Sequence, residues 1–321
     1  MTRNENKVIY GLNDFENSVV MKINQTKIQL IHNPTAGAEE HEAEHLMEML
    51  NAAGYRCSYA SSKKKIMKKI ATDVKYIAVA GGDGTVRKVV LTMLDKKLKY
   101  KRPLAVLPLG TANNIASSLG IEENLRLNAE SWKQEKLQKL DIGVATTRKE
   151  EKYFIESFGF GLFPALIKWM DEQPKTLSED PNEEVLQAHN ALLHLAKHYQ
   201  PIPATILLDG KELNDEFLMI ELLNISRLGP KLVLAKNANP GDGMLELILI
   251  KAKQRPLIIK YLEEIVAGKK PQFPIKSIAV NQFKIKLDTK DIHVDDELME
   301  TNQHTWDVGV LPHMIEVLLT K

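Results

Sequence analysis

The chain has 321 residues, and at roughly 150 residues per domain its length favours two domains. Hydrophobic residues make up 44% and charged residues 26%, values of a globular protein that exclude a disordered or fibrous chain. The 43 Lys and Arg nearly balance the 42 Asp and Glu, and a net charge of +1 argues against a nucleic-acid partner.

The location of the protein is suggested by what the sequence lacks. The single cysteine, Cys57, has no partner for an internal disulfide. The polar start at residues 1–7 lacks the apolar core of a secretory signal, and no uncharged apolar run approaches the ~18 residues of a spanning helix. We therefore expect a cytoplasmic protein that touches a membrane only from its surface.

Residues 1–25 show no clear period and are expected to form an N-terminal extension. From 26 to about 140, short β-rich runs alternate with helical patterns. Strands are expected at 27–32, 55–59, 76–80 and 104–108, and helices around 43–50, 62–71 and 86–94. This alternation predicts a doubly wound, mostly parallel α/β domain, whose ligands bind beyond the carboxyl ends of the strands.

The pattern changes after about residue 140 to many short strands separated by Gly and Pro. Strands are expected at 153–157, 203–208, 217–224, 245–251, 278–280 and 283–288. They predict an antiparallel β-sandwich over 141–306, interrupted by one helical insertion at 182–199. A last strand, at about 307–321, is expected to return to the first domain.

A glycine-rich loop follows the expected strand at 76–80 and opens the next helix. It consists of Gly81, Gly82, Asp83, Gly84 and Thr85. Glycines let the backbone approach an anion closely, and the start of a helix offers free N–H groups, so we expect this loop to hold phosphates. Its spacing matches neither the dinucleotide-binding fingerprint nor the lysine-containing P-loop. A tight turn with Asp83 as helix cap is the alternative interpretation.

A second loop follows the expected strand at 104–108. It contains Gly110, Thr111, Asn113 and Asn114. Because neighbouring parallel strands end at the same edge of a sheet, the two loops are expected to meet there. Their hydroxyl and amide groups could then contact one nucleotide.

The two loops, with the run Asn33-Pro34-Thr35-Ala36-Gly37 upstream, resemble the diacylglycerol kinase catalytic family, which includes bacterial lipid kinases and eukaryotic sphingosine kinases. Further segments follow in family order. They are the glycine-rich segment 158–161, the segment 224–245 that ends in Asp-Gly-x-Leu, and the segment 294–297, which resembles a late Asp-Gly-Glu. The resemblance covers roughly residues 26–321.

This resemblance implies a two-domain kinase that transfers the γ-phosphate of MgATP to a lipid hydroxyl, diacylglycerol-like or sphingoid. Asp83 would belong to a carboxylate–water–magnesium network at the phosphates. The implied nucleotide contacts are Asn33, Ser62, Gly81, Gly82, Asp83, Gly84, Thr85, Gly110, Thr111 and Asn113. Phosphoryl transfer requires charge neutralisation at the phosphates and an oriented acceptor hydroxyl, which such groups can supply.

Two further roles follow from the resemblance. Asp242, with backbone oxygens of Asn239 and Met244, would hold a structural Mg²⁺, although a Pro-Gly-Asp-Gly turn alone would also explain it. Glu297 would be the general base, a function typically worth ~10²–10⁴-fold in rate. Glu297 also lies in an acidic run, where a solvated carboxylate is the alternative.

The chain departs from the family pattern at three positions. It has Lys88 where the family usually has Glu, Asn114 where it has Asp, and Asp296 where it has Gly. Two alternatives therefore stay open: an NAD kinase, which shares the Gly-Gly-Asp-Gly-Thr loop, and a nucleotide- or lipid-binding protein whose catalysis is lost.

Basic runs at 63–70 and 96–102 could draw the protein to an anionic membrane, with solvated helix faces and loops as the alternative. A homodimer is also left open.

Overall fold

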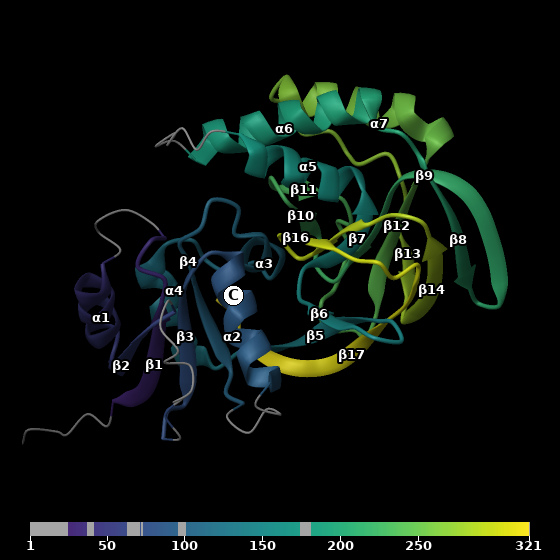
Figure 1. Ribbon diagram of the computed structural model, residues 1–321. Coiled ribbons are helices and arrows are strands. Elements are labelled where there is room, and N and C mark those ends of the chain that lie inside the picture. The colour runs from purple at the N-terminus through teal and green to yellow at the C-terminus, as the bar shows by residue number, and fades with distance from the viewer. Residues whose placement is uncertain are drawn as a thin grey trace, which may run out of the picture.

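The computed structural model describes residues 25–36, 42–62, 71, 73–95, 101–173 and 181–320. The lysine-rich helix expected at 62–71 and the extension at 1–25 lie almost entirely outside these ranges. Figure 1 shows two lobes, an α/β lobe built from the first half of the chain and a β-rich lobe built mainly from the second. Within the described residues, no helix is long and apolar enough to cross a membrane.

A parallel sheet forms the centre of the α/β lobe, in the order β2-β1-β3-β4. Its strands are β1 (Thr26–His32), β2 (Tyr55–Ser61), β3 (Tyr76–Gly81) and β4 (Leu104–Pro108). All residues of β3 and β4 are buried, which explains their continuous apolar runs.

Helices cover both faces of this sheet. They are α1 (Ala43–Ala52), α2 (Asp83–Asp95), α3 (Asn114–Ser118) and α4 (Leu125–Ser131), followed by the 3₁₀ turn Trp132–Gln134. Alternate residues of β3 point to opposite faces, so Val79 shares a core cluster with Val86 of α2, whereas Ala78 shares another with Leu50 of α1. The predicted doubly wound α/β architecture is confirmed.

The β-rich lobe consists of antiparallel strands packed around an aromatic and aliphatic core that includes Phe158, Leu222 and Trp306. Its strands are β5 (Leu137–Thr146), β6 (Glu151–Phe154), β7 (Ser157–Gly161), β8 (Ile202–Leu208), β9 (Lys211–Leu223), β12 (Leu245–Lys251), β13 (Ile278–Val280), β14 (Gln282–Leu287), β15 (Asp291–Val294), β16 (Glu297–Glu300) and β17 (Thr305–Leu318), with the short pair β10 (Arg227–Leu228) and β11 (Leu232–Val233). The predicted antiparallel β-sandwich is confirmed.

Three helices pack together over this lobe, as Figure 1 shows: α5 (Leu162–Glu172), α6 (Pro181–His198) and α7 (Arg255–Val266), the last preceded by the 3₁₀ turn Ala252–Gln254. The sequence analysis names only the insertion that corresponds to α6. Helices α5 and α7 were not predicted; α5 continues directly from the glycine-rich strand β7. Pro256 at the start of α7 was the available helix signal.

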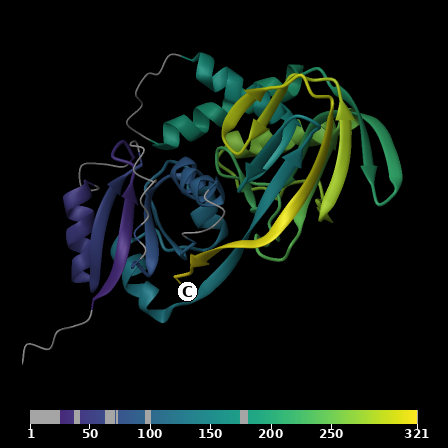
Figure 2. The same ribbon diagram turned by 60° about the horizontal axis from the view of Figure 1, so that its bottom comes forward.

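The two lobes are joined by β5 and β17, which run side by side between them in Figure 2. The strand β17 pairs with β14 at its start and reaches β4 at its end, where Val317 pairs in parallel with Leu104. A register shift between Leu311 and Ile315, with His313 at a φ of 59°, accommodates the change of direction.

Candidate active site

The two glycine-rich loops lie next to each other because β3 and β4 are neighbouring parallel strands. A Cβ atom on Gly110 would lie 2.6 Å from the Cα of Gly82, and a Cβ on Gly82 would lie 3.1 Å from the Cα of Gly110. Only residues without side chains allow this approach. The loops therefore form one continuous backbone surface.

Asp83 fastens the second loop to the first. Its carboxylate accepts hydrogen bonds from the backbone N–H groups of Asn114 (2.8 Å) and Ile115 (3.0 Å), at the start of α3. Asn113 has a φ of 51°, and its side chain bonds both backbone groups of Gly110. Asp83 thus caps α3 across the loops, whereas the alternative interpretation made it the cap of its own helix.

A polar cavity of about 460 Å³ opens on one side of the loops. Besides both loops it is lined by Asn33, whose Oδ1 accepts a hydrogen bond from the Thr35 hydroxyl at 3.0 Å, and by the buried Ser62. Lys88 also lines it and donates a hydrogen bond from Nζ to the backbone oxygen of Ser62. All the residues expected to contact a nucleotide border this cavity, except Gly81, Asp83 and Asn113.

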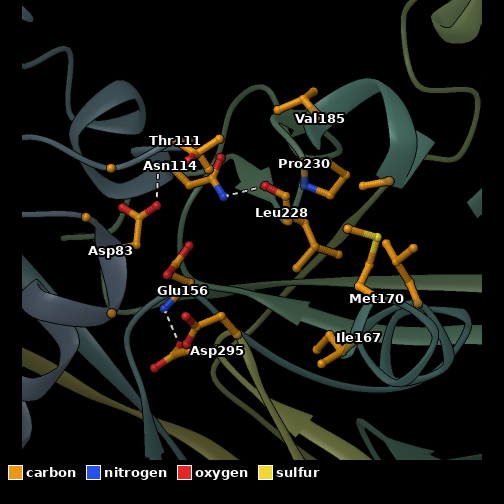
Figure 3. A pocket seen from close by; sticks show the side chains of 18 of the residues that line it. Asp83, Thr111, Asn114, Glu156, Ile167, Met170, Val185, Leu228, Pro230 and Asp295 are labelled. Atoms are coloured by element: carbon orange, nitrogen blue, oxygen red, sulfur yellow. Dashed lines mark hydrogen bonds between the residues drawn. The ribbon is translucent and has the colours of Figure 1, made fainter. Parts of the chain in front are cut away.

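A second cavity, of about 400 Å³, lies on the other side of the loops and is called the acceptor cavity below. Figure 3 shows Asp83 and Glu156 at one side of it and Ile167 and Met170 of α5 at the other. Helix α6 contributes Val185 and Ala188, and Glu184 of the same helix accepts a hydrogen bond of 3.4 Å from Thr111. Gly82, Gly84, Gly110 and Thr111 border both cavities.

Six carboxylates border the acceptor cavity: Asp83, Glu156, Asp171, Glu184, Asp295 and Asp296. Three of them, Asp83, Glu156 and Asp295, have pKa values above their ordinary range. Burial is the main cause of each shift. It raises the pKa of Asp83 against two backbone N–H bonds, and raises that of Asp295 to about 6 against the charge of Arg87. The pKa of Glu156 is raised well above its usual value by burial and by the neighbouring aspartates. Buried carboxylates with raised pKa values favour the binding of a cation beside them.

Asp295 anchors the turn between β15 and β16. One of its oxygens accepts the backbone N–H groups of residues 155, 156 and 157 at 2.8 to 3.2 Å. The other oxygen forms an ion pair with Nε of Arg87 at 2.7 Å, a charge contact in which the N–H is not aligned for a hydrogen bond. Nη1 of Arg87 lies 2.6 Å from Glu297.

A buried ion pair lies behind this turn. Nε2 of His293 contacts both carboxylate oxygens of Glu221 at 2.8 and 2.9 Å, and its Nδ1 lies 2.7 Å from the backbone oxygen of Asp295. Burial lowers the pKa of His293, but the charge of Glu221 outweighs it, so the pKa is raised. The pair fixes the backbone from which residues 295–297 project.

The expected metal residues lie elsewhere. Asp242 accepts a hydrogen bond of 3.0 Å from the backbone N–H of Met244, and the backbone oxygen of Asn239 receives a long one of 3.4 Å from Asp242. None of the three lines either cavity. The donors are the hard oxygens that Mg²⁺ prefers, with one carboxylate. Among the described residues, no group of three His, Cys, Asp or Glu could hold a metal ion.

Sequence reasoning missed Glu156, Arg87 and the apolar wall on α5. Glu156 lies two residues before the glycine-rich segment 158–161, and a charged residue inside an otherwise buried run was a usable signal. Arg87 follows the first loop by two residues and was overlooked in favour of Lys88. No sequence pattern could have identified the α5 wall, since its apolar residues become a cavity lining only through packing.

Comparisons with known proteins cover most of the chain. Residues 27–145 match the family model of the diacylglycerol kinase catalytic domain, and residues 180–319 match that of the YegS C-terminal NAD kinase beta sandwich-like domain. A diacylglycerol kinase of Bacillus subtilis is 29% identical over 70% of this chain and 74% of its own length. The "Probable lipid kinase YegS-like" of Shewanella frigidimarina is 27% identical over 85% of this chain and 86% of its own.

The fold is also shared with a solved structure. The crystal structure of a diacylglycerol kinase from Bacillus anthracis superposes with a TM-score of 0.71 at 22% identity, covering 91% of this chain and 96% of that one. At this identity the likeness concerns the fold alone.

The fold and the matched domains define a kinase. Residues 27–145 belong to the diacylglycerol kinase catalytic domain family, as the sequence resemblance predicted, and residues 180–319 form the YegS C-terminal domain that follows it.

Proposed function

We propose that the protein transfers the γ-phosphate of MgATP to the hydroxyl group of a lipid, diacylglycerol-like or sphingoid. One observation carries this proposal: the polar cavity and the acceptor cavity share four loop residues, Gly82, Gly84, Gly110 and Thr111. Phosphates bound on the shared glycine-rich backbone would then lie between a nucleotide in the polar cavity and an apolar acceptor in the other.

The polar side suits a nucleotide. Backbone N–H groups of the loops and the start of α2 would hold phosphate oxygens, and Lys88 and Ser62 border the rest of the cavity. Asp83 keeps the two loops together and would orient water on the Mg²⁺ that accompanies ATP. A cation there would also relieve the repulsion among the buried carboxylates. The loop with Asp242, Asn239 and Met244 is proposed to hold a separate structural Mg²⁺, bound mostly through backbone oxygens and water.

The apolar side suits a lipid. Phe163, Leu166, Ile167 and Met170 line the acceptor cavity from α5, while Asp83, Glu156 and Asp295 lie on its opposite side (Figure 3). This polarity would bury an acyl chain against the helices and direct a hydroxyl towards the loops. A lipid acceptor implies peripheral contact with a membrane, which is part of the proposal.

The test is transfer of label from γ-labelled ATP in mixed micelles containing diacylglycerol, a sphingoid base, phosphatidylglycerol or a polyprenol. The proposal expects at least one labelled lipid. Formation of NADP from NAD in a coupled assay would favour the NAD kinase alternative. ATP binding without turnover on any acceptor would favour a binding protein that has lost catalysis.

A further inference from the structure

The turn at 295–296 presents a carboxylate that the family pattern lacks, because Asp296 stands where the pattern has glycine. We propose that Asp296, and not Glu297, is the general base that takes the proton from the acceptor hydroxyl. This inference rests on the proposed phosphotransfer function and assigns a residue within the same site.

The side chains of Asp296 and Glu297 point in different directions. Val294 pairs with Glu297 across the hairpin, so Asp295 and Asp296 form its two-residue turn. Asp296 is exposed and lines the acceptor cavity together with Asp83 and Glu156. Glu297 begins β16, has 59% of its side chain exposed and lines neither cavity. Instead, its carboxylate pairs with Arg87.

The Asp296 carboxylate lies close to the first glycine-rich loop. A Cβ atom on Gly84 would lie 3.3 Å from Oδ2 of Asp296. Gly84 borders both cavities, so this oxygen lies over the loop where phosphate and acceptor would meet. Within the described part of the chain, no hydrogen bond or ion pair engages the Asp296 side chain. Its oxygens are therefore accessible to an incoming hydroxyl.

The turn that carries Asp296 is held rigidly by hydrogen bonds. Asp295 has a φ of 57°, and its carboxylate is bonded to three backbone N–H groups. Its own N–H donates to the backbone oxygen of Ser157 at 2.8 Å, and His293 contacts its backbone oxygen. Because Asp295 is fixed through its carboxylate, its N–H and its backbone oxygen, Asp296 projects from a rigid backbone, as a catalytic group requires.

The reaction step balances with this assignment. The acceptor oxygen forms a bond to the γ-phosphorus while its proton moves to a carboxylate oxygen of Asp296. The bond between the γ-phosphorus and the bridging oxygen of the β-phosphate breaks, and ADP leaves with that electron pair. After product release, Asp296 returns the proton to water.

The test compares two isosteric variants, Asp296→Asn and Glu297→Gln, with the lipid on which the wild type is active. Loss of a general base is expected to lower kcat of Asp296→Asn by about 10²–10⁴-fold. Its KM for ATP should stay near the wild-type value, because the loops are untouched. Glu297→Gln should retain kcat within about tenfold, since it loses one ion pair of a half-exposed carboxylate while Arg87 keeps its charge contact with Asp295.

A third variant, Asp296→Gly, restores the residue of the family pattern. It should be as slow as Asp296→Asn, and thermal unfolding should show both variants folded. Near-wild-type kcat in either Asp296 variant, or an equal loss in Glu297→Gln, would overturn the assignment. A wild-type protein that transfers phosphate to no acceptor would instead overturn the proposed function.

Discussion

The contact between Gly82 and Gly110 offers the sharpest perturbation of the proposed nucleotide site. A Cβ atom on Gly110 would lie 2.6 Å from the Cα of Gly82, whereas ordinary contacts begin at 3.4 Å. In Gly110→Ala the two loops must separate by about 0.8 Å. The new Cβ cannot turn away by rotation, and the Cα of Gly82 belongs to the backbone, so only a backbone shift can relieve the contact. A misplacement near 1 Å can cost about 10²-fold, which we expect in the kcat/KM for ATP.

The assay combines calorimetric titration of MgATP with steady-state kinetics on a lipid acceptor. Gly309→Ala is the matched control, since its Cβ would meet only the backbone oxygen of Asn281 at 3.5 Å and its φ lies outside the left-handed region. This control should bind ATP like the wild type. If Gly110→Ala also bound MgATP with wild-type affinity while folded, the two loops would not form one phosphate site.

Three further predictions concern stability, protons and the acceptor. Glu221→Gln breaks the buried pair with His293 and should lower the free energy of unfolding by about 3 kcal/mol at pH 6, measured by denaturant titration. Because the folded pKa of His293 is raised, this contribution is complete below its ordinary value of 6.5 and is lost as pH rises through the folded pKa. Binding of MgATP at pH 6 to 7 should release protons, measured calorimetrically in buffers of different ionisation enthalpy, because a cation lowers the raised pKa values beside it; Glu156→Gln should release fewer. Ile167→Glu should raise KM for the lipid at least tenfold, by burying a charge in the acceptor cavity, and leave ATP binding unchanged.

Each of these predictions has a control and a contrary outcome. Lys284→Gln breaks an exposed pair with Asp307 and should cost less than about 1 kcal/mol; an equal loss in Glu221→Gln would contradict the buried-pair argument. Equal proton release in wild type and Glu156→Gln would exclude Glu156 from the cation's surroundings. Leu257→Glu, on the exposed face of α7, should leave the lipid KM unchanged. If Ile167→Glu behaved the same way, the acceptor cavity would not hold the lipid.

The sequence was sufficient for the architecture and for the two loops. At Gly82 and Gly110 the two loop backbones approach too closely for a side chain, and the alternation of strands and helices has a period that sequence shows directly. The pairing of the loops followed from the rule that neighbouring parallel strands end at one edge.

The rest of the site depends on contacts between distant segments. Glu156, Arg87 and Asp295 lie far apart in the chain, and their contacts with one another appear only once the segment before β7, α2 and the β15–β16 turn are packed together. The same holds for Glu297, where the sequence showed a carboxylate at the expected position but not the ion pair with Arg87. The resemblance implies that Glu297 is the general base, and we propose Asp296 in its place; the metal role of Asp242 stays a prediction from the resemblance.

The central claim is phosphoryl transfer from ATP to a lipid, and one measurement tests it most directly. Wild type and Asp83→Ala are incubated with γ-labelled ATP, Mg²⁺ and the lipid panel, and the extracted lipids are separated and counted. The account predicts label in at least one lipid with the wild type and none above background with Asp83→Ala, which loses the bonds that join the two loops. Absence of label from every lipid, with a wild-type protein that binds MgATP, would contradict it.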